Sequence, residues 1–265
     1  MQEKRIYLEA EGEAPYIDCY LRCDGTSPTM LVIPGGGYGM VCSDREGGPI
    51  AEAFFEKGYS AFVLTYRVAP NHRYPTQLLD AARAIAYIRE NAGALSVDPN
   101  RIFTVGFSAG GHLVGTVATS HAYAEKLLGL PENFARPTGS VYAYPVVSAM
   151  CPTHVGSFEN LSGVPFCELT DEQKRLFSIE ENVTEKTPPA FIWHTAVDEL
   201  VPVYGSIRLA EAYIKCGVPV SLHIYPYGTH GVALANAKTE CGNENWIQPL
   251  AEGWVDYAAE FLKTV

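Results

Sequence analysis

Ser108 stands in the segment GFSAG, residues 106–110, between two glycines and directly after an apolar run. This G-x-S-x-G spacing is typical of a sharp turn between a strand and a helix, which holds a serine hydroxyl in the open as a nucleophile. A turn without chemistry can have the same pattern, so the segment alone leaves both interpretations open. A serine alcohol is a poor nucleophile, and it needs a base that takes its proton and a third group that orients the base.

Two polar residues farther along the chain have the setting that these partners need. Asp198 follows the apolar run at 189–195, and His230 lies in a glycine-flanked loop after the run at 220–226. In a parallel sheet such positions lie at the carboxyl edge of the strands, where functional groups gather. The chain order Ser108, Asp198, His230 is also that of a known type of serine, acid and histidine triad. We therefore predict Ser108 as nucleophile, His230 as base and Asp198 as the acid.

Other residues compete for these roles. Glu199 adjoins Asp198 and is a second candidate for the acid, although we prefer Asp198. His112 follows Ser108 by about one helical turn and is expected to brace the serine turn, whereas His194 lies within a predicted strand and is expected to pack there. The remaining histidines have no comparable position after a strand: His72, His121, His154 and His223.

A glycine-rich loop can supply the N–H donors that an attack on an ester carbonyl requires. Such an attack creates an oxyanion, which preorganised donors stabilise. The run VIPGGGYG at 32–39 follows a predicted strand, and consecutive glycines let a backbone approach a substrate closely. We predict the N–H groups of Gly36, Gly37 and Ala109 as the donors, while Tyr38 either contributes its own N–H or forms a wall of the acyl pocket. The run lacks the spacing of phosphate-binding glycine loops, which argues against nucleotide binding.

The apolar pattern predicts the elements that hold these residues. Alternating residues near 6–8 and 17–21 indicate two half-buried antiparallel strands. Apolar runs without alternation indicate strands buried on both faces, at 29–34, 60–66, 101–107, 140–147, 189–195 and 220–226. Helical patterns lie between or after these runs, at 49–57, 76–91, 203–216 and 247–261, with a further helix after Ser108. The alternation predicts one α/β domain, residues 1–265, whose parallel sheet has helices on both faces.

Residues 148–187 interrupt the alternation and predict a cap-like insertion over one end of the sheet. One short helical stretch, around 170–178, is expected in it. The segment HVGSFENLSG at 154–163 combines an aromatic side chain, Phe158, with the hydrogen-bonding groups of His154, Ser157, Glu159 and Asn160. Because a sugar can use both kinds of surface, we predict that Phe158 helps to bind the alcohol part of a substrate. The alternative is that Phe158 only fills the core of the insertion.

Composition restricts the partners of the chain. It has 19 basic and 30 acidic residues, a formal net charge of −11 and no basic run, which argues against nucleic acid and membrane partners. The start lacks the apolar core of a signal peptide, and the seven cysteines are irregularly spaced, so we expect a cytoplasmic protein with reduced thiols. No Cys/His spacing predicts a zinc site, and no metal or organic cofactor is expected. The oligomeric state stays open, a homo-oligomer included.

The motifs PGGGYG, GFSAGGHL, GSFENLSG, PPAFIWHTAVDELVPVYGS and HGVAL resemble those of the α/β-hydrolase superfamily, and the chain looks most similar to small acetyl xylan esterase-like enzymes. The resemblance covers most of the chain from about residue 29 onward. It implies an eight-stranded, mostly parallel sheet and hydrolysis of short acyl esters, often acetyl groups on sugars or xylo-oligosaccharides. Pro34 replaces the histidine of lipase-type loops, which disfavours bulky lipid esters. Val197 stands where such esterases commonly carry another acid, which favours Asp198.

Two other functions stay open at this point. A serine peptidase or amidase can share the fold, but such enzymes usually add a propeller or a larger domain. A non-catalytic α/β-hydrolase that serves as a binding module commonly lacks a member of the triad, whereas this chain has all three candidates.

Overall fold

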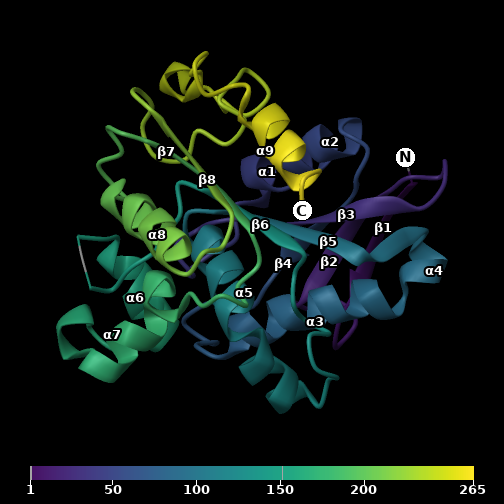
Figure 1. Cartoon of the computed structure of the whole chain (residues 1–265), viewed down its shortest axis with the longest axis horizontal. Helices are drawn as coiled ribbons and strands as arrows, with labels where there is room; N and C mark the ends of the chain where they lie inside the picture. Colours follow the sequence, from purple (N-terminus) through teal and green to yellow (C-terminus); the bar gives the residue numbers. More distant parts are fainter. Residues whose placement is uncertain (1, 151) are drawn as a thin grey trace.

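A single sheet forms the centre of the computed structural model, which describes residues 2–150 and 152–265. Its strands are β1 (Gln2–Tyr7), β2 (Tyr16–Leu21), β3 (Ser27–Ile33), β4 (Ser60–Thr65), β5 (Val97–Phe107), β6 (Gly139–Ala143), β7 (Ala190–Thr195) and β8 (Val220–Tyr225). Their order across the sheet is β1-β2-β4-β3-β5-β6-β7-β8 (Figure 1). β2 is antiparallel to β1 and β4, and the pairings from β4 to β8 are parallel. The predicted α/β fold with an eight-stranded, mostly parallel sheet is confirmed.

Helices cover both faces of this sheet. They are α1 (Ser43–Glu46), α2 (Gly48–Glu56), α3 (Thr76–Glu90), α4 (Ala92–Leu95), α5 (Ala109–Leu128), α6 (Val155–Ser162), α7 (Asp171–Phe177), α8 (Tyr204–Lys215) and α9 (Trp254–Leu262). Three short 3₁₀ turns accompany them: η1 (Phe166–Glu168), η2 (Ile179–Asn182) and η3 (Glu244–Trp246). α3, α5 and α8 pack on one face, while α2 and α9 pack on the other (Figure 1).

The central strand β3 shows why apolar runs without alternation predicted this arrangement. Successive side chains of a strand point to opposite faces of the sheet. Met30 and Val32 enter the core beneath α2 and α9, whereas Leu31 and Ile33 enter the core beneath α3 and α5. All four are fully buried, and each such burial contributes about 1.5–3 kcal/mol. Both faces therefore select apolar residues, and the polar alternation disappears.

Three predicted elements differ from the structure. The strand expected at 140–147 ends at Ala143, because Tyr144 has a φ of 37° and Pro145 follows it. The helix expected from 247 begins only at Trp254, since Pro249 disfavours helical backbone at the residue before it. β8 is half-exposed rather than buried on both faces, because it lies at the edge of the sheet and pairs only with β7.

The segment between β6 and β7 contains α6, η1, α7 and η2 and packs beside α5 and α8 (Figure 1). The short helix expected around 170–178 is α7, whereas α6 was not expected. One of the seven cysteines, Cys151, lies outside the described residues, and no disulfide joins the six that are described. In the described parts of the chain, no helix combines the length and apolar character needed to cross a bilayer.

Candidate active site

Ser108 lies at the turn between β5 and α5, where its backbone has φ 52° and ψ −119°. A Cβ at Gly106 would lie 2.3 Å from the carbonyl oxygen of Gly110, and a Cβ at Gly110 would lie 2.1 Å from that of Ile33. Neither flanking position can therefore carry a side chain. A residue held in such a strained conformation costs about 1–3 kcal/mol and persists only where its surroundings enforce it. The close contacts of the two glycines, with the hydrogen bond from the Ser108 N–H to the Ala143 carbonyl (3.0 Å), enforce it here.

Ser108, His230 and Asp198 form one row of hydrogen bonds. His230 Nε2 lies 2.8 Å from Ser108 Oγ, and His230 Nδ1 lies 2.7 Å from Asp198 Oδ2. The three residues follow β5, β8 and β7 and so meet at the carboxyl edge of the sheet. Ser108 and Asp198 are buried, and the His230 side chain is 14% exposed. The structure thus brings together the three residues that the sequence order singled out.

The Asp198 carboxylate has separate partners at its two oxygens. Its Oδ1 accepts hydrogen bonds from the backbone N–H groups of Leu200 (3.0 Å) and Val201 (2.9 Å). Its Oδ2 contacts His230 and lies 3.3 Å from His194 Nε2. Burial raises the pKa of this carboxyl, but the hydrogen bonds from His194, His230 and Val201, with the charge of His230, hold the pKa well below its ordinary value. Asp198 is therefore an ionised acceptor at neutral pH.

The competing residues occupy other places. The Glu199 side chain is exposed, while its neighbour Asp198 faces the imidazole of His230. His194 is fully buried in β7, with Nδ1 2.8 Å from Ser206 Oγ and Nε2 2.9 Å from the Val201 carbonyl oxygen. It is thus a packed strand histidine that also supports the acid.

His112 braces the start of α5. Its Nε2–H donates to the carbonyl of Phe177 (2.7 Å), so its Nδ1 accepts from the Tyr38 hydroxyl (2.7 Å). Burial lowers the pKa of His112 to about 4, although the bond to Phe177 opposes this shift. A neutral imidazole therefore connects α5 with the glycine loop on one side and α7 on the other.

The predicted oxyanion donors lie around Ser108. Gly36 and Gly37 belong to the loop between β3 and α1 and have φ values of 124° and 62°, which a side chain would strain. The preceding N–H, that of Gly35, is already occupied, because it donates to Glu46 Oε2 at 2.8 Å. Ala109 is the first residue of α5, where an N–H has no acceptor within the helix. The N–H groups of Gly36, Gly37 and Ala109 therefore stay the predicted oxyanion donors.

A pocket of about 290 Å³ opens in front of Ser108, near the lower end of the range for small-molecule sites, about 300–1,000 Å³. The glycine loop, α1, the α6 region and the loops after β7 and β8 contribute to it. Its lining residues are Gly36, Gly37, Cys42, Arg45, Glu46, Ser108, His154, Asn160, Leu200 and His230. Polar side chains line this pocket beside Ser108, among them Arg45, His154 and Asn160.

Two predicted binding residues do not reach this pocket with their side chains. Phe158 is fully buried, with its ring centroid 5.4 Å from that of His112 and 6.5 Å from that of Phe177. Tyr38 is 1% exposed and its hydroxyl points to His112, so it forms no wall of the acyl pocket. The aromatic rings pack in the core because apolar burial outweighs any contact that they could make at the surface. Of the two roles predicted for Tyr38, only that of its N–H as an oxyanion donor stays open.

His154 and Asn160 occupy the place where Phe158 was expected. Asn160 Nδ2 donates to the Gly37 carbonyl (2.9 Å), and His154 Nδ1 lies 2.8 Å from Ser157 Oγ. Burial lowers the pKa of His154, and the nearby charge of His230 lowers it further. Both residues are among the hydrogen-bonding groups that the segment at 154–163 was predicted to offer a sugar, although α6 itself was not predicted. One face of α6 reaches the pocket, and another face carries Phe158 into the core.

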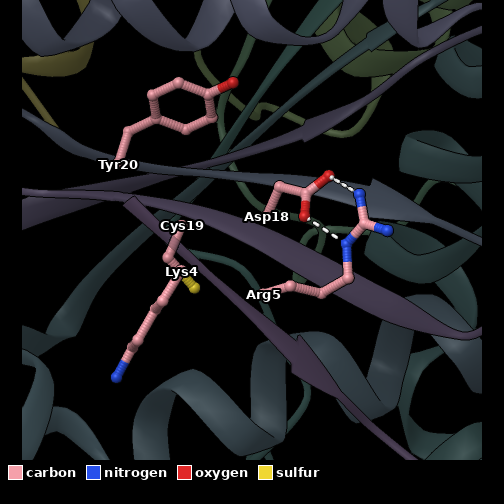
Figure 2. A pocket seen from close by; sticks show the side chains of 5 residues that line it. All are labelled: Lys4, Arg5, Asp18, Cys19 and Tyr20. Carbon is pink, nitrogen blue, oxygen red and sulfur yellow. Dashed lines mark hydrogen bonds and ion pairs between the residues drawn. The ribbon is translucent and has the colours of Figure 1, made fainter. Parts of the chain in front are cut away.

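A second hollow, of about 530 Å³, lies on β1 and β2, at the opposite end of the sheet from β8 (Figure 2). Arg5 and Asp18 point toward each other there and form two hydrogen bonds, of 2.6 and 2.9 Å. An exposed ion pair of this kind contributes about 0–1 kcal/mol. No residue of the Ser108 site lines this hollow. Across residues 2–150 and 152–265, no group of three or more His, Cys, Asp or Glu side chains is placed to hold a metal ion.

The sequence profile of the BD-FAE family matches residues 17–213, well over half of the chain. The chain is 37% identical over 245 residues to endo-1,4-beta-xylanase B of Butyrivibrio fibrisolvens, covering 89% of the chain and 37% of the relative. It is 31% identical over 231 residues to an acetylxylan esterase of Xylanibacter ruminicola, covering 85% of the chain and 45% of the relative. The chain thus spans less than half the length of these two relatives.

Solved structures agree with this relationship over nearly the whole chain. The acetyl ester-xyloside bifunctional hydrolase from Caldicellulosiruptor lactoaceticus has a TM-score of 0.81 and 33% identity, and the match covers 96% of this chain and 89% of that one. The carboxylesterase Cest-2923 from Lactobacillus plantarum has a TM-score of 0.86 and 28% identity, with coverage of 100% and 98%.

Proposed function

Because the chain belongs to the BD-FAE family, within the α/β-hydrolase fold, we propose that it is a serine carboxylic ester hydrolase. The observation that carries the proposal is the row of hydrogen bonds from Ser108 through His230 to Asp198, with distances of 2.8 and 2.7 Å. This is the arrangement in which a histidine takes the serine proton and a buried acid orients the histidine. The names of the relatives, which include carboxylesterases and acetylxylan esterases, give independent support.

The proposed reaction proceeds in two halves. His230 Nε2 takes the proton of Ser108 Oγ as this oxygen attacks the ester carbonyl, and the Asp198 carboxylate stabilises the imidazolium that forms. The N–H groups of Gly36, Gly37 and Ala109 surround the developing oxyanion, whose stabilisation is worth about 2.7–4 kcal/mol per donor. The imidazolium then protonates the leaving alcohol. Water, deprotonated by His230, releases the acid from Ser108 in the second half.

Ser108→Ala tests this assignment. The variant should lose nearly all hydrolysis of 4-nitrophenyl acetate and all labelling by a fluorophosphonate, with an unchanged circular dichroism spectrum. A variant that kept a tenth of the wild-type rate would exclude Ser108 as the nucleophile. Absence of both activity and labelling in the wild-type chain would instead favour a binding module. The matching anilide distinguishes an esterase from an amidase, since we expect the ester alone to be cleaved efficiently.

For the substrate, we propose short acyl esters, above all acetyl groups on sugars or xylo-oligosaccharides. The small pocket with polar side chains at its edge supports this, and so do the acetylxylan esterase and the acetyl ester-xyloside hydrolase among the relatives. His154 and Asn160 are the groups best placed to contact a sugar alcohol, in place of Phe158. His154→Ala should lower kcat/KM for an acetylated xylo-oligosaccharide more than for an aryl acetate, because only the sugar uses binding energy remote from the carbonyl. Equal losses would place the sugar elsewhere.

A further inference from the structure

Glu46 is a buried carboxylate at the edge of the pocket that the proposed reaction does not use. It is the last residue of α1, is only 2% exposed, and lines the pocket together with Ser108 and His230. Among the described residues, no cation forms an ion pair with it. A buried charge without a cation is costly unless hydrogen bonds satisfy it. The partners of Glu46 therefore indicate what the charge is for.

The first partner is the glycine loop. Glu46 Oε2 accepts the N–H of Gly35 at 2.8 Å, directly before the predicted oxyanion donors Gly36 and Gly37. A Cβ at Gly35 would lie 2.9 Å from this oxygen and 3.0 Å from Ser108 Cβ. The carboxylate thus touches the loop at the point where the loop passes the serine. A shift of this contact would move the donors that follow it.

The second partner is Tyr144, which follows β6. Its buried hydroxyl donates to Glu46 Oε1 (2.8 Å) and accepts from the backbone N–H of Ala233 (3.1 Å). Burial, followed by the charge of Glu46, raises the pKa of Tyr144 well above its ordinary value, so the hydroxyl keeps its proton as a donor. The Tyr144 ring packs edge-on against the His230 ring, with a centroid separation of 5.1 Å. Tyr144 therefore contacts the histidine loop through both its ring and its hydroxyl.

A continuous path of hydrogen bonds joins the two loops that the reaction needs. It runs from the Gly35 N–H through Glu46 and Tyr144 to the N–H of Ala233, and we call it the Glu46–Tyr144 bridge. The neighbouring Arg45 adds a further contact, because it donates to the carbonyl of Gly231 and lies over a Trp246 ring at 4.0 Å. α1 thus contacts the histidine loop, and it directly follows the glycine loop in the chain.

We infer that Glu46 and Tyr144 are positioning residues, whose bridge keeps the oxyanion donors and His230 in register on either side of Ser108. The inference rests on the proposed function, because it concerns the same site. Misplacing a catalytic group by about 1 Å can cost 10²-fold in rate. A carboxylate accepts at both oxygens, whereas a carboxamide accepts at only one. Glu46→Gln therefore leaves one of the two donors without its acceptor.

The test uses three bridge variants: Glu46→Gln, Tyr144→Phe, and the double variant that carries both substitutions. Each is compared with the control variant Tyr142→Phe. Tyr142 is a matched control, because it is a fully buried tyrosine of β6, two residues before Tyr144. Its hydroxyl bonds to that of Tyr213 (2.9 Å) on the opposite face of the sheet. We measure kcat and KM for 4-nitrophenyl acetate, melting temperature, and inhibition by a trifluoromethyl ketone. The ketone forms a tetrahedral adduct with the serine and so reports directly on the oxyanion site.

Each bridge variant should lower kcat about 10- to 100-fold with little change in KM and weaken the ketone in parallel. The double variant should lose less than the product of the two single losses, because both break one path. Tyr142→Phe should have a lower melting temperature than the wild type, but its kcat should stay within about twofold of the wild-type value. Bridge variants that match Tyr142→Phe in kcat and in ketone affinity would overturn the inference. If Glu46→Gln does not fold, Tyr144→Phe decides alone, since it keeps the ring.

Failure of this inference can be told apart from failure of the proposed function. If the wild type hydrolyses the ester and Ser108→Ala does not, the proposed function stands whatever the bridge variants do. If Ser108→Ala retains the wild-type rate, the proposed function fails, and any effect of the bridge concerns another site.

Discussion

Asp198→Asn should stop the reaction by changing the tautomer of His230. In the native site the backbone N–H groups of Leu200 and Val201 both donate to Oδ1 of the acid. An asparagine can satisfy these two donors only by placing its carbonyl oxygen there. Its NH₂ group then takes the position of Oδ2, facing His230 Nδ1.

The consequence for His230 follows from this fixed orientation. An NH₂ group donates to Nδ1, so the imidazole carries its proton on Nε2, which points to Ser108 Oγ. Such an imidazole cannot take the serine proton. In a triad of this kind the change lowers kcat by about 10⁴, which corresponds to about 5 kcal/mol at about 1.36 kcal/mol for each factor of ten.

The assay is the kcat for 4-nitrophenyl acetate at neutral pH, with the rate of fluorophosphonate labelling as a second measure of serine reactivity. Both should fall by a similar factor while the circular dichroism spectrum stays that of the wild type. Glu199→Gln is the matched control, because it removes the adjacent, exposed carboxylate and should leave kcat within about twofold. A loss below about tenfold in Asp198→Asn, or a larger loss in Glu199→Gln, would refute the reasoning.

Three further predictions follow from the geometry. Phe158→Ala should destabilise the fold by about 3–5 kcal/mol and reduce activity on sugar and aryl acetates alike, as urea unfolding and parallel assays can measure; a selective loss on the sugar would contradict its core position. Burial lowers the pKa of His112 to about 4, so as the pH falls below about 6.5 the imidazole is protonated in the unfolded chain before it is protonated in the folded protein. Between about pH 6.5 and pH 4, His112 should therefore lower the free energy of unfolding by roughly 3 kcal/mol. The free energy of unfolding of His112→Asn should therefore fall less over this range than that of the wild type, and equal decreases would exclude His112 as the source. For acyl length, kcat/KM should fall from acetate to octanoate esters, and a rise along this series would show that the pocket of about 290 Å³ does not limit the acyl group.

The parts of the site that the sequence predicted are those tied to strand ends. Ser108, Asp198 and His230 each follow an apolar run, and parallel strands bring such positions to one edge whatever the details of the intervening helices. The glycine loop could be recognised in the sequence because it also follows an apolar run. Its consecutive glycines indicate a close backbone approach to a substrate, although they do not predict the exact shape of the loop. The parallel sheet with helices on both faces followed from the apolar runs, as the two-sided burial of β3 shows.

The parts that the sequence did not predict depend on three-dimensional packing. Phe158 and Asn160 are two residues apart, yet α6 directs the ring into the core and the amide to the glycine loop, and neither its helical period nor its orientation was recognised. Glu46 had no signal at all, since an acidic residue in a polar stretch is usually exposed. Its burial depends on Tyr144, which is 98 residues away in the chain.

The strained turn at Ser108 fixes the position of the nucleophile independently of its chemical identity. Its φ of 52° is imposed by the tight backbone approaches at Gly106 and Gly110, and the serine hydroxyl takes no part in holding it. Exchange of the oxygen for sulfur or for hydrogen therefore leaves the scaffold unaltered and changes only the reacting atom. Evolution can therefore place another nucleophile at position 108, provided that Gly106 and Gly110 stay glycine.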